Sequence, residues 1–171
     1  CYSRALPSNR GRRARSAGQN IIPTTTGAAI AVTEVIPELK GVFDGISIRV
    51  PTPNVSLLDL TVWVKKATTK AEVNKALRDA ANGALKGIMV YTDELLVSSD
   101  FNGSPASASI DGDSTMVVGG NMVKVLAWYD NESGFSNRML DVAALMARSP
   151  SPRVFPTKAG QLSVFVKKAG L

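Results

Sequence analysis

The segment VSLLDLTVWVKKATTKAEVNKALRDAANG, residues 55–83, joins a strand pattern directly to a helix pattern and is the most informative part of the sequence. Over residues 55–66, Leu and Val alternate with Asp, Thr, Trp and Lys, which is the period of a strand with one buried face. Thr69 and Glu72 then have the spacing of a capping box, and Gly83 ends a run of apolar residues at helical spacing. A strand followed by an amphipathic helix predicts a sheet that helices cover.

The same periodicities assign most of the remaining chain to short strands and two further helices. Strands are expected over 45–50, 86–93 and 95–101, and two or three more within 108–130, broken at Gly119–Gly120. Helices are expected over 26–36 and 133–148, the second capped by Ser133. Residues 1–19 are expected to be loop, and 149–171 a poorly patterned tail in which QLSVFVKK is a candidate strand. Strands clustered between a few helices predict an α+β fold, with a mixed, largely antiparallel sheet and helices on one face.

The formal charge of +6 is concentrated at the two ends of the chain. Residues 1–19 hold five Arg and residues 148–171 hold five Lys or Arg, without any acid, whereas the middle of the chain is net acidic. Because a nucleic-acid-binding domain carries its basic charge on a folded face, this distribution argues against a nucleic-acid partner. No apolar run approaches the roughly 20 residues of a membrane helix, so no membrane partner is expected.

The sequence contains one cysteine, Cys1, and no histidine. This excludes a disulfide within the chain, metal sites built from Cys and His, and triads that use a His base. Cys1 is terminal and outside any helix start, so nothing activates its thiol, and we nominate neither a catalytic residue nor a metal ligand. We interpret the acid-free start, which lacks Met, as a cut or out-of-frame end, with a transit peptide as the alternative.

Three hydroxyls precede a glycine in PTTTG, residues 23–27, where a helix is expected to begin. A helix N-terminus leaves backbone N–H groups without partners and carries partial positive charge. One threonine can serve as a cap. Alternatively, the hydroxyls of Thr24, Thr25 and Thr26 can surround an anion, which Gly27 would let approach the backbone. The pattern alone favours the cap, because most helix starts have a cap and few bind phosphate.

Two other positions also allow a structural and a functional interpretation. Arg49 lies on the strand face opposite Ile46 and Ile48, where it is either a solvated side chain or a clamp for phosphate or carboxylate. Asn131 lies in the acidic turn between a strand and the last helix. That turn either caps the helix or holds the Asn131 amide rigidly to recognise a planar polar group such as a carboxamide.

Five stretches occur in a collinear order: RRARSAGQNIIPTTTGAA (12–29), PELKG (37–41), RVPTPNVSLLDL (49–60), YTDELLVSSDFNG (91–103) and MVKVLAWYDNESGFSNRMLD (122–141). Together they closely resemble the catalytic domain of phosphorylating glyceraldehyde-3-phosphate dehydrogenases, from about residue 12 to about residue 147. The resemblance implies a catalytic-domain fragment at 12–147, flanked by unmatched basic segments at 1–11 and 148–171. The dinucleotide-binding Rossmann domain of the family has no counterpart in the sequence.

The resemblance also implies a reaction and assigns residues to it. In the family, glyceraldehyde 3-phosphate is oxidised with NAD and inorganic phosphate to 1,3-bisphosphoglycerate, a cytoplasmic step of glycolysis carried out by homotetramers. Thr26 and Gly27 match the site of the attacking phosphate, and Arg13 matches an arginine that reaches this region. Arg49 matches the arginine that clamps the substrate phosphate, and Asn131 matches the residue that fixes the nicotinamide carboxamide.

The departures from the family concern its covalent chemistry. Nothing in the sequence matches the Ser-Cys-Thr-Thr-Asn-Cys stretch that holds the nucleophile, and the histidine base is missing. Phe135 stands where the family often has tyrosine beside the nicotinamide ring. We therefore expect the isolated chain to lack dehydrogenase activity. A partial dehydrogenase, a non-catalytic remnant or interaction protein, and a nucleic-acid binder acting through its basic ends remain the three interpretations, the last being the least favoured.

Overall fold

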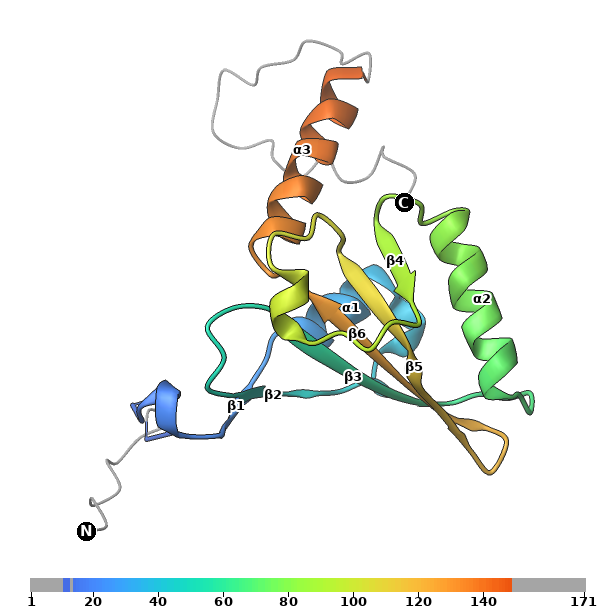
Figure 1. The fold of residues 1–171 in the computed structure, drawn as a ribbon, viewed down its shortest axis with the longest axis horizontal. Coiled ribbons are helices and arrows are strands. Elements are labelled where there is room, and N and C mark those ends of the chain that lie inside the picture. The colour runs from blue at the N-terminus through green and yellow to red at the C-terminus, as the bar shows by residue number, and fades with distance from the viewer. Residues whose placement is uncertain (1–10, 13, 149–171) are drawn as a thin grey trace. The chain divides into compact units, whose positions relative to one another are not determined.

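The computed structural model describes residues 11, 12 and 14–148, which divide into two compact units within residues 1–54 and 55–171 (Figure 1). No helix in the described part of the chain is long and apolar enough to cross a membrane. The candidate strand QLSVFVKK lies outside the described residues.

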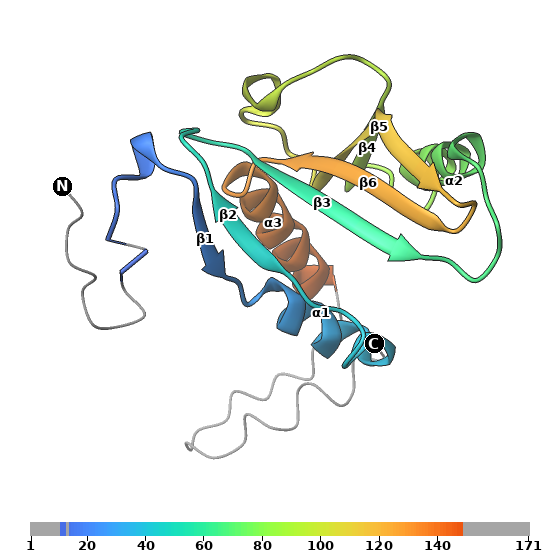
Figure 2. The same cartoon turned by 90° about the horizontal axis from the view of Figure 1, so that it is seen from below.

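The first unit is built around a two-stranded antiparallel sheet, with one short helical segment before its first strand and two in the connection between its strands. Its elements are η1 (Ala17–Gln19), β1 (Ile22–Thr25), α1 (Ala28–Val35), η2 (Pro37–Leu39) and β2 (Ile46–Arg49). Strands β1 and β2 lie side by side (Figure 2), and Ile22 pairs with Arg49 while Thr25 pairs with Ile46. The expected helix over 26–36 and strand over 45–50 are confirmed, whereas β1 was not predicted.

The second unit contains a four-stranded mixed sheet with the order β3-β6-β5-β4. Its strands are β3 (Ser56–Trp63), β4 (Met89–Thr92), β5 (Ala108–Val118) and β6 (Met122–Tyr129), and only the β4–β5 pair is parallel. Gly119 and Gly120 form the turn between β5 and β6 with φ values of 60° and 78°. Positive φ at both central positions is the requirement of a tight hairpin turn, so the expected break at these glycines is confirmed.

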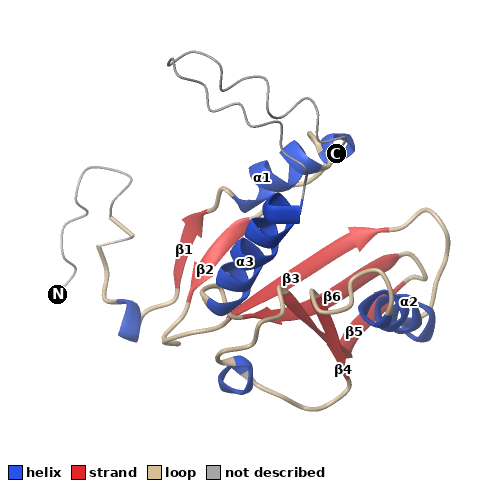
Figure 3. Ribbon diagram, turned by 90° about the horizontal axis from the view of Figure 1, so that it is seen from above, coloured by secondary structure: helices blue, strands red, loops and turns tan. Residues whose placement is uncertain are grey.

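Helix α2 (Lys70–Asn82) begins at the predicted capping box and packs beside β4 and β5 (Figure 3). The Thr69 side chain accepts from the Glu72 N–H, and the Glu72 carboxylate accepts from the Thr69 N–H at 2.9 Å. The pKa of Glu72 is lowered because its carboxylate accepts hydrogen bonds from the Thr69 N–H, the Thr69 hydroxyl and the Thr68 hydroxyl. The Asn74 amide donates to the Gly112 carbonyl at 2.7 Å, which fastens α2 to β5.

The expected strand over 95–101 is wrong, because this segment is irregular and ends in η3 (Ser98–Phe101). The Asp100 carboxylate accepts from the Val97 N–H at 2.8 Å, which stabilises the turn. The Phe101 ring is buried and stacks on Trp128 of β6, with 5.7 Å between ring centroids. An apolar residue that the pattern assigned to a strand face therefore anchors a short helical turn to the sheet.

The last helix, α3 (Ser133–Arg148), matches its predicted bounds but not its predicted cap. The Ser133 hydroxyl donates to the Gly103 carbonyl at 3.0 Å, and the Asp130 carboxylate accepts from the Ser133 N–H at 2.9 Å. Asp130, rather than Ser133, therefore caps the helix. The two units together confirm an α+β fold with a mixed, largely antiparallel sheet, and the described residues contain no doubly wound parallel sheet.

Candidate functional site

The PTTTG motif spans the end of β1 and the start of α1. The Thr26 hydroxyl accepts a hydrogen bond from the Ala28 N–H at 3.1 Å, and the Gly27 carbonyl accepts the first helical bond from Ala31 at 3.0 Å. Thr26 thus satisfies one free donor of the helix, as the capping interpretation predicts. The Thr24 hydroxyl oxygen is buried and has no hydrogen-bond partner among the described residues.

Gly27 has neither a backbone nor a packing reason to be glycine. Its φ of −87° and ψ of −3° lie in the right-handed helical region, which any residue adopts. A Cβ built on Gly27 would meet no atom within 4 Å. The space in front of the exposed α1 N-terminus is therefore open, and a ligand can approach the backbone N–H groups there.

Arg49 lies at the opposite end of the two-stranded sheet from the end of β1 that leads into Thr26 and Gly27. It is exposed, and its guanidinium makes no hydrogen bond or ion pair with the residues that the structure describes. Because Arg49 pairs with Ile22, four residues before Thr26, its backbone lies about 13 Å along the strand from Thr26. The two positions therefore suit two separate anions better than one. Arg13 lies outside the described residues.

Asn131 belongs to the second unit, in the turn between β6 and α3. The residue is exposed, and its side chain has no hydrogen-bond partner within the described part of the chain. Phe135, one turn into α3, is 66% exposed. The neighbouring Asp130 is buried and holds the turn, a role that the sequence analysis considered only as general capping by this acidic stretch.

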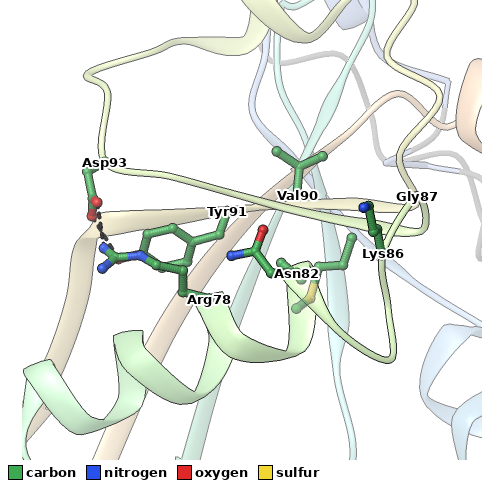
Figure 4. A pocket seen from close by; sticks show the side chains of 9 residues that line it. Arg78, Asn82, Lys86, Gly87, Val90, Tyr91 and Asp93 are labelled. Carbon is green, nitrogen blue, oxygen red and sulfur yellow. Dashed lines mark hydrogen bonds and ion pairs between the residues drawn. The ribbon is translucent and has the colours of Figure 1, made fainter.

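A cavity of about 420 Å³ lies between the end of α2 and β4, and none of the residues nominated from the sequence lines it (Figure 4). At one end, Arg78 pairs with Asp93 at 2.7 Å and lies over the Tyr91 ring, 4.6 Å from its centroid. Burial and the hydrogen bond that the Tyr91 hydroxyl donates to Asp93 raise the pKa of Tyr91. No periodicity in the sequence indicated this cavity, because it forms between elements rather than within one.

Comparisons with known proteins agree with the order of the motifs. A family model, described as glyceraldehyde 3-phosphate dehydrogenase, C-terminal domain, matches residues 3–131. The chain is 58% identical over 143 residues to glyceraldehyde-3-phosphate dehydrogenase 1 of Bacillus subtilis (strain 168), which covers 84% of this chain and 43% of that protein. It is also 58% identical over 142 residues to glyceraldehyde-3-phosphate dehydrogenase of Geobacillus stearothermophilus, covering 83% of this chain and 42% of the relative.

A third relative gives the same result: glyceraldehyde-3-phosphate dehydrogenase 2 of Synechocystis sp. is 58% identical over 138 residues, or 81% of this chain and 41% of that protein. The chain thus spans about two-fifths of the length of the curated relatives it matches. The family model covers well over half of the chain, and the matched residues include the two candidate anion sites, at Thr26–Gly27 and at Arg49, together with Asn131. This chain belongs to the family of glyceraldehyde 3-phosphate dehydrogenase C-terminal domains.

Proposed function

We propose that this chain provides the phosphate-binding and carboxamide-binding part of a phosphorylating glyceraldehyde-3-phosphate dehydrogenase. Thr26 and Gly27 bind inorganic phosphate, with Arg13 reaching the same region. Arg49 binds the phosphate of glyceraldehyde 3-phosphate, and Asn131 binds the carboxamide of NAD. The fragment with this role spans residues 12–147, and the protein acts in the cytoplasm as a homo-oligomer, a tetramer in the family.

The observation that carries the proposal is the unexplained glycine at position 27. Neither its φ and ψ nor its surroundings exclude a larger residue. An anion bound to the free N–H groups of α1 would use the space that a side chain would occupy. Four paired positions of the β1–β2 sheet separate Arg49 from this helix start. This separation supports a second anion position, which a reaction with two phosphates requires.

Asn131 has the chemistry that a nicotinamide carboxamide needs. A primary amide offers a donor and an acceptor, which together complement the acceptor and donor of another primary amide. NAD, when bound, would accept the hydride from the substrate carbon. The residues of this chain would orient the two reactants. Because the 171 residues contain no histidine and Cys1 as their only cysteine, they supply no paired nucleophile and base.

The proposal is tested by titrating the ¹⁵N-labelled chain with inorganic phosphate and following its amide resonances. We expect saturable shifts at the amides of Gly27 and Ala28, and a second binding event that the Arg49→Gln variant loses. The Lys40→Gln variant is the matched control, since Lys40 is an exposed cation of the same unit. Shifts that follow ionic strength alone, equal with chloride and phosphate, would contradict the proposal.

Turnover is tested separately with glyceraldehyde 3-phosphate, NAD and phosphate. We expect the purified chain to form no NADH, because the bond-forming groups are missing from it. NADH production by the isolated chain, unchanged by Arg49→Gln, would show that the assignment of roles is wrong. NADH production that Arg49→Gln abolishes would keep the phosphate role and overturn only the expected inactivity.

A second candidate function, that of an interaction protein, is supported by the surface of α3. Six apolar side chains of this helix are at least half exposed: Phe135, Met139, Leu140, Val142, Leu145 and Met146. Exposed apolar patches of this kind mark surfaces that bind other chains or domains. Sedimentation as a monomer at all concentrations, with no binding of a dinucleotide-binding domain from a relative, would count against this candidate.

A further inference from the structure

The carboxylate of Asp130 joins two segments that are distant in the sequence. Asp130 is 3% exposed, and its Oδ1 accepts from the N–H groups of Glu132 at 3.0 Å and Ser133 at 2.9 Å. Its Oδ2 accepts from the N–H of Gly103 at 2.9 Å. Burying a carboxylate is costly unless its oxygens are satisfied, and charge-assisted bonds from backbone N–H groups are strong. The three bonds therefore fasten the start of α3 to the loop after η3.

The loop after η3 contributes a donor and an acceptor to this junction, both from the backbone of Gly103. Gly103 has a φ of 75°, a left-handed conformation that favours glycine and turns its N–H toward Asp130. Ser133 donates its hydroxyl back to the Gly103 carbonyl at 3.0 Å. A Cβ added to Gly134 would lie 2.8 Å from the Ala106 carbonyl oxygen, so the first turn of α3 lies directly against the loop backbone. The junction is held from both sides.

Asn131 lies within a hydrogen-bonded ring, which the Asp130 side chain closes by accepting from the Glu132 N–H. The bond from the Glu132 N–H to Asp130 Oδ1 spans Asn131 and restricts its φ and ψ, as in other turns closed by an Asp side chain. The Asn131 side chain itself stays exposed and has no hydrogen-bond partner among the described residues. The backbone of Asn131 is thus fixed while its amide is left available to a ligand.

We propose that Asp130 is a positioning residue, which holds Asn131 in the orientation needed to bind a nicotinamide carboxamide. The inference rests on the proposed function of Asn131, and adds that the bond to Gly103 sets the affinity of the site. Restricting a binding group beforehand lowers the entropy that binding must remove, so affinity depends on the ring and not only on the Asn131 amide.

A purely structural cap and a positioning residue differ in what they change. A cap raises the free energy of unfolding and leaves the affinity of the folded molecules unaltered. A positioning residue changes the affinity for the nicotinamide group and leaves the phosphate affinity at Thr26 and Gly27 unaltered. The two affinities can be measured in one sample of folded chain, so the comparison needs no correction for the folded fraction.

The test uses the full 171-residue chain, labelled with ¹⁵N and titrated with nicotinamide mononucleotide and with inorganic phosphate. The Asp130→Asn variant keeps one acceptor oxygen for the Asn131 ring, but its amide nitrogen cannot accept from Gly103. The Asp111→Asn variant is the matched control, because Asp111 also accepts from a backbone N–H, that of Ser114 at 3.0 Å, at the register irregularity of β5 in the same unit. Asn131→Ala removes the binding amide itself.

We expect Asp130→Asn to weaken the nicotinamide response at Asn131 roughly tenfold, the effect of one lost hydrogen bond, with the phosphate response and Asp111→Asn equal to the unsubstituted chain. If the unsubstituted chain and Asp130→Asn respond equally, the inference fails and the proposed function stands. If the unsubstituted chain does not respond at Asn131, the proposed role of Asn131 fails, and the inference fails with it.

A measurement on the unsubstituted chain covers the case in which Asp130→Asn does not fold. The closed ring predicts a backbone order parameter for Asn131 near that of a rigid strand, about 0.85. A value below about 0.6 is typical of a flexible segment and would overturn the inference without any variant.

Discussion

Replacing Gly27 by alanine separates the fold of the α1 N-terminus from its proposed ligand. The new Cβ meets no atom within 4 Å, and the φ of −87° is open to alanine, so the native state gains no strain. Alanine stabilises by about 0.4–1 kcal/mol through the unfolded chain, whereas at a helix cap it is less favourable than glycine by about 0.5 kcal/mol. The two effects nearly cancel, and we expect the free energy of unfolding to change by less than about 1 kcal/mol.

The same substitution should weaken phosphate binding strongly. The methyl group would occupy part of the open space at the α1 N-terminus, through which the anion would approach the backbone. Losing one hydrogen bond to a charged group costs about 1.5–3 kcal/mol, which corresponds to roughly tenfold to a hundredfold in the dissociation constant. Urea unfolding gives the stability, and the phosphate titration of the labelled chain gives the affinity.

Gly45→Ala is the control for this experiment. Gly45 belongs to the same unit, and a Cβ there also meets no atom within 4 Å, but it is no part of the proposed site. Its variant should bind phosphate as the unsubstituted chain does. The reasoning is refuted if Gly27→Ala loses more than about 2 kcal/mol of stability, since glycine would then be a structural requirement. It is equally refuted if both variants bind phosphate with unchanged affinity.

Two further predictions concern the second unit. Gly134→Ala should destabilise the chain by about 1–3 kcal/mol in urea unfolding, because its Cβ would lie 2.8 Å from the Ala106 carbonyl oxygen and backbone cannot move aside easily. Glu72→Gln should reduce stability at neutral pH but not in acid. The folded-state pKa of Glu72 is lowered, so its contribution is present above its ordinary value of 4.5 and is lost as the pH falls through the lower folded-state value. The melting temperatures of the unsubstituted chain and of Glu72→Gln, measured from pH 7 to pH 3, should therefore converge as the pH falls. A difference that stays constant with pH would contradict the role given to the Glu72 carboxylate.

The elements that the sequence predicted correctly are those specified by local periodicity. The strand pattern before Thr69 and the helix pattern up to Gly83 each fit one regular period, and the structure contains both. The errors arise where the local pattern is short. β1 has only four residues, one of them Pro23, which cannot donate to a ladder and argues against a strand. The segment 95–101 has apolar residues at strand spacing, but Phe101 is fixed by Trp128, which the local pattern does not include.

The candidate site also has one part that local sequence specifies and one part that depends on long-range contacts. Thr26 and Gly27, the residues proposed to bind phosphate, are adjacent, and the helix start that presents them is specified by the motif itself. A reader of the sequence can therefore identify them. The ring around Asn131 depends on Gly103, which is 27 residues from Asp130 in the sequence. No pattern within the acidic turn indicates that its carboxylate bonds to that loop, so the basis for the proposed positioning of Asn131 is found only in the structure.

Because the two parts of the candidate site depend on different contacts, we expect destabilisation to affect their ligand binding differently. The N-terminus of α1 needs only β1, β2 and one helical turn, so substitutions elsewhere in the chain should leave the groups proposed to bind an anion in place. The turn at Asn131 needs both the loop after η3 and the packing of Phe101 on Trp128 that supports η3. Carboxamide binding should therefore be lost before phosphate binding when the second unit is destabilised, since the two activities depend on units with separate internal contacts.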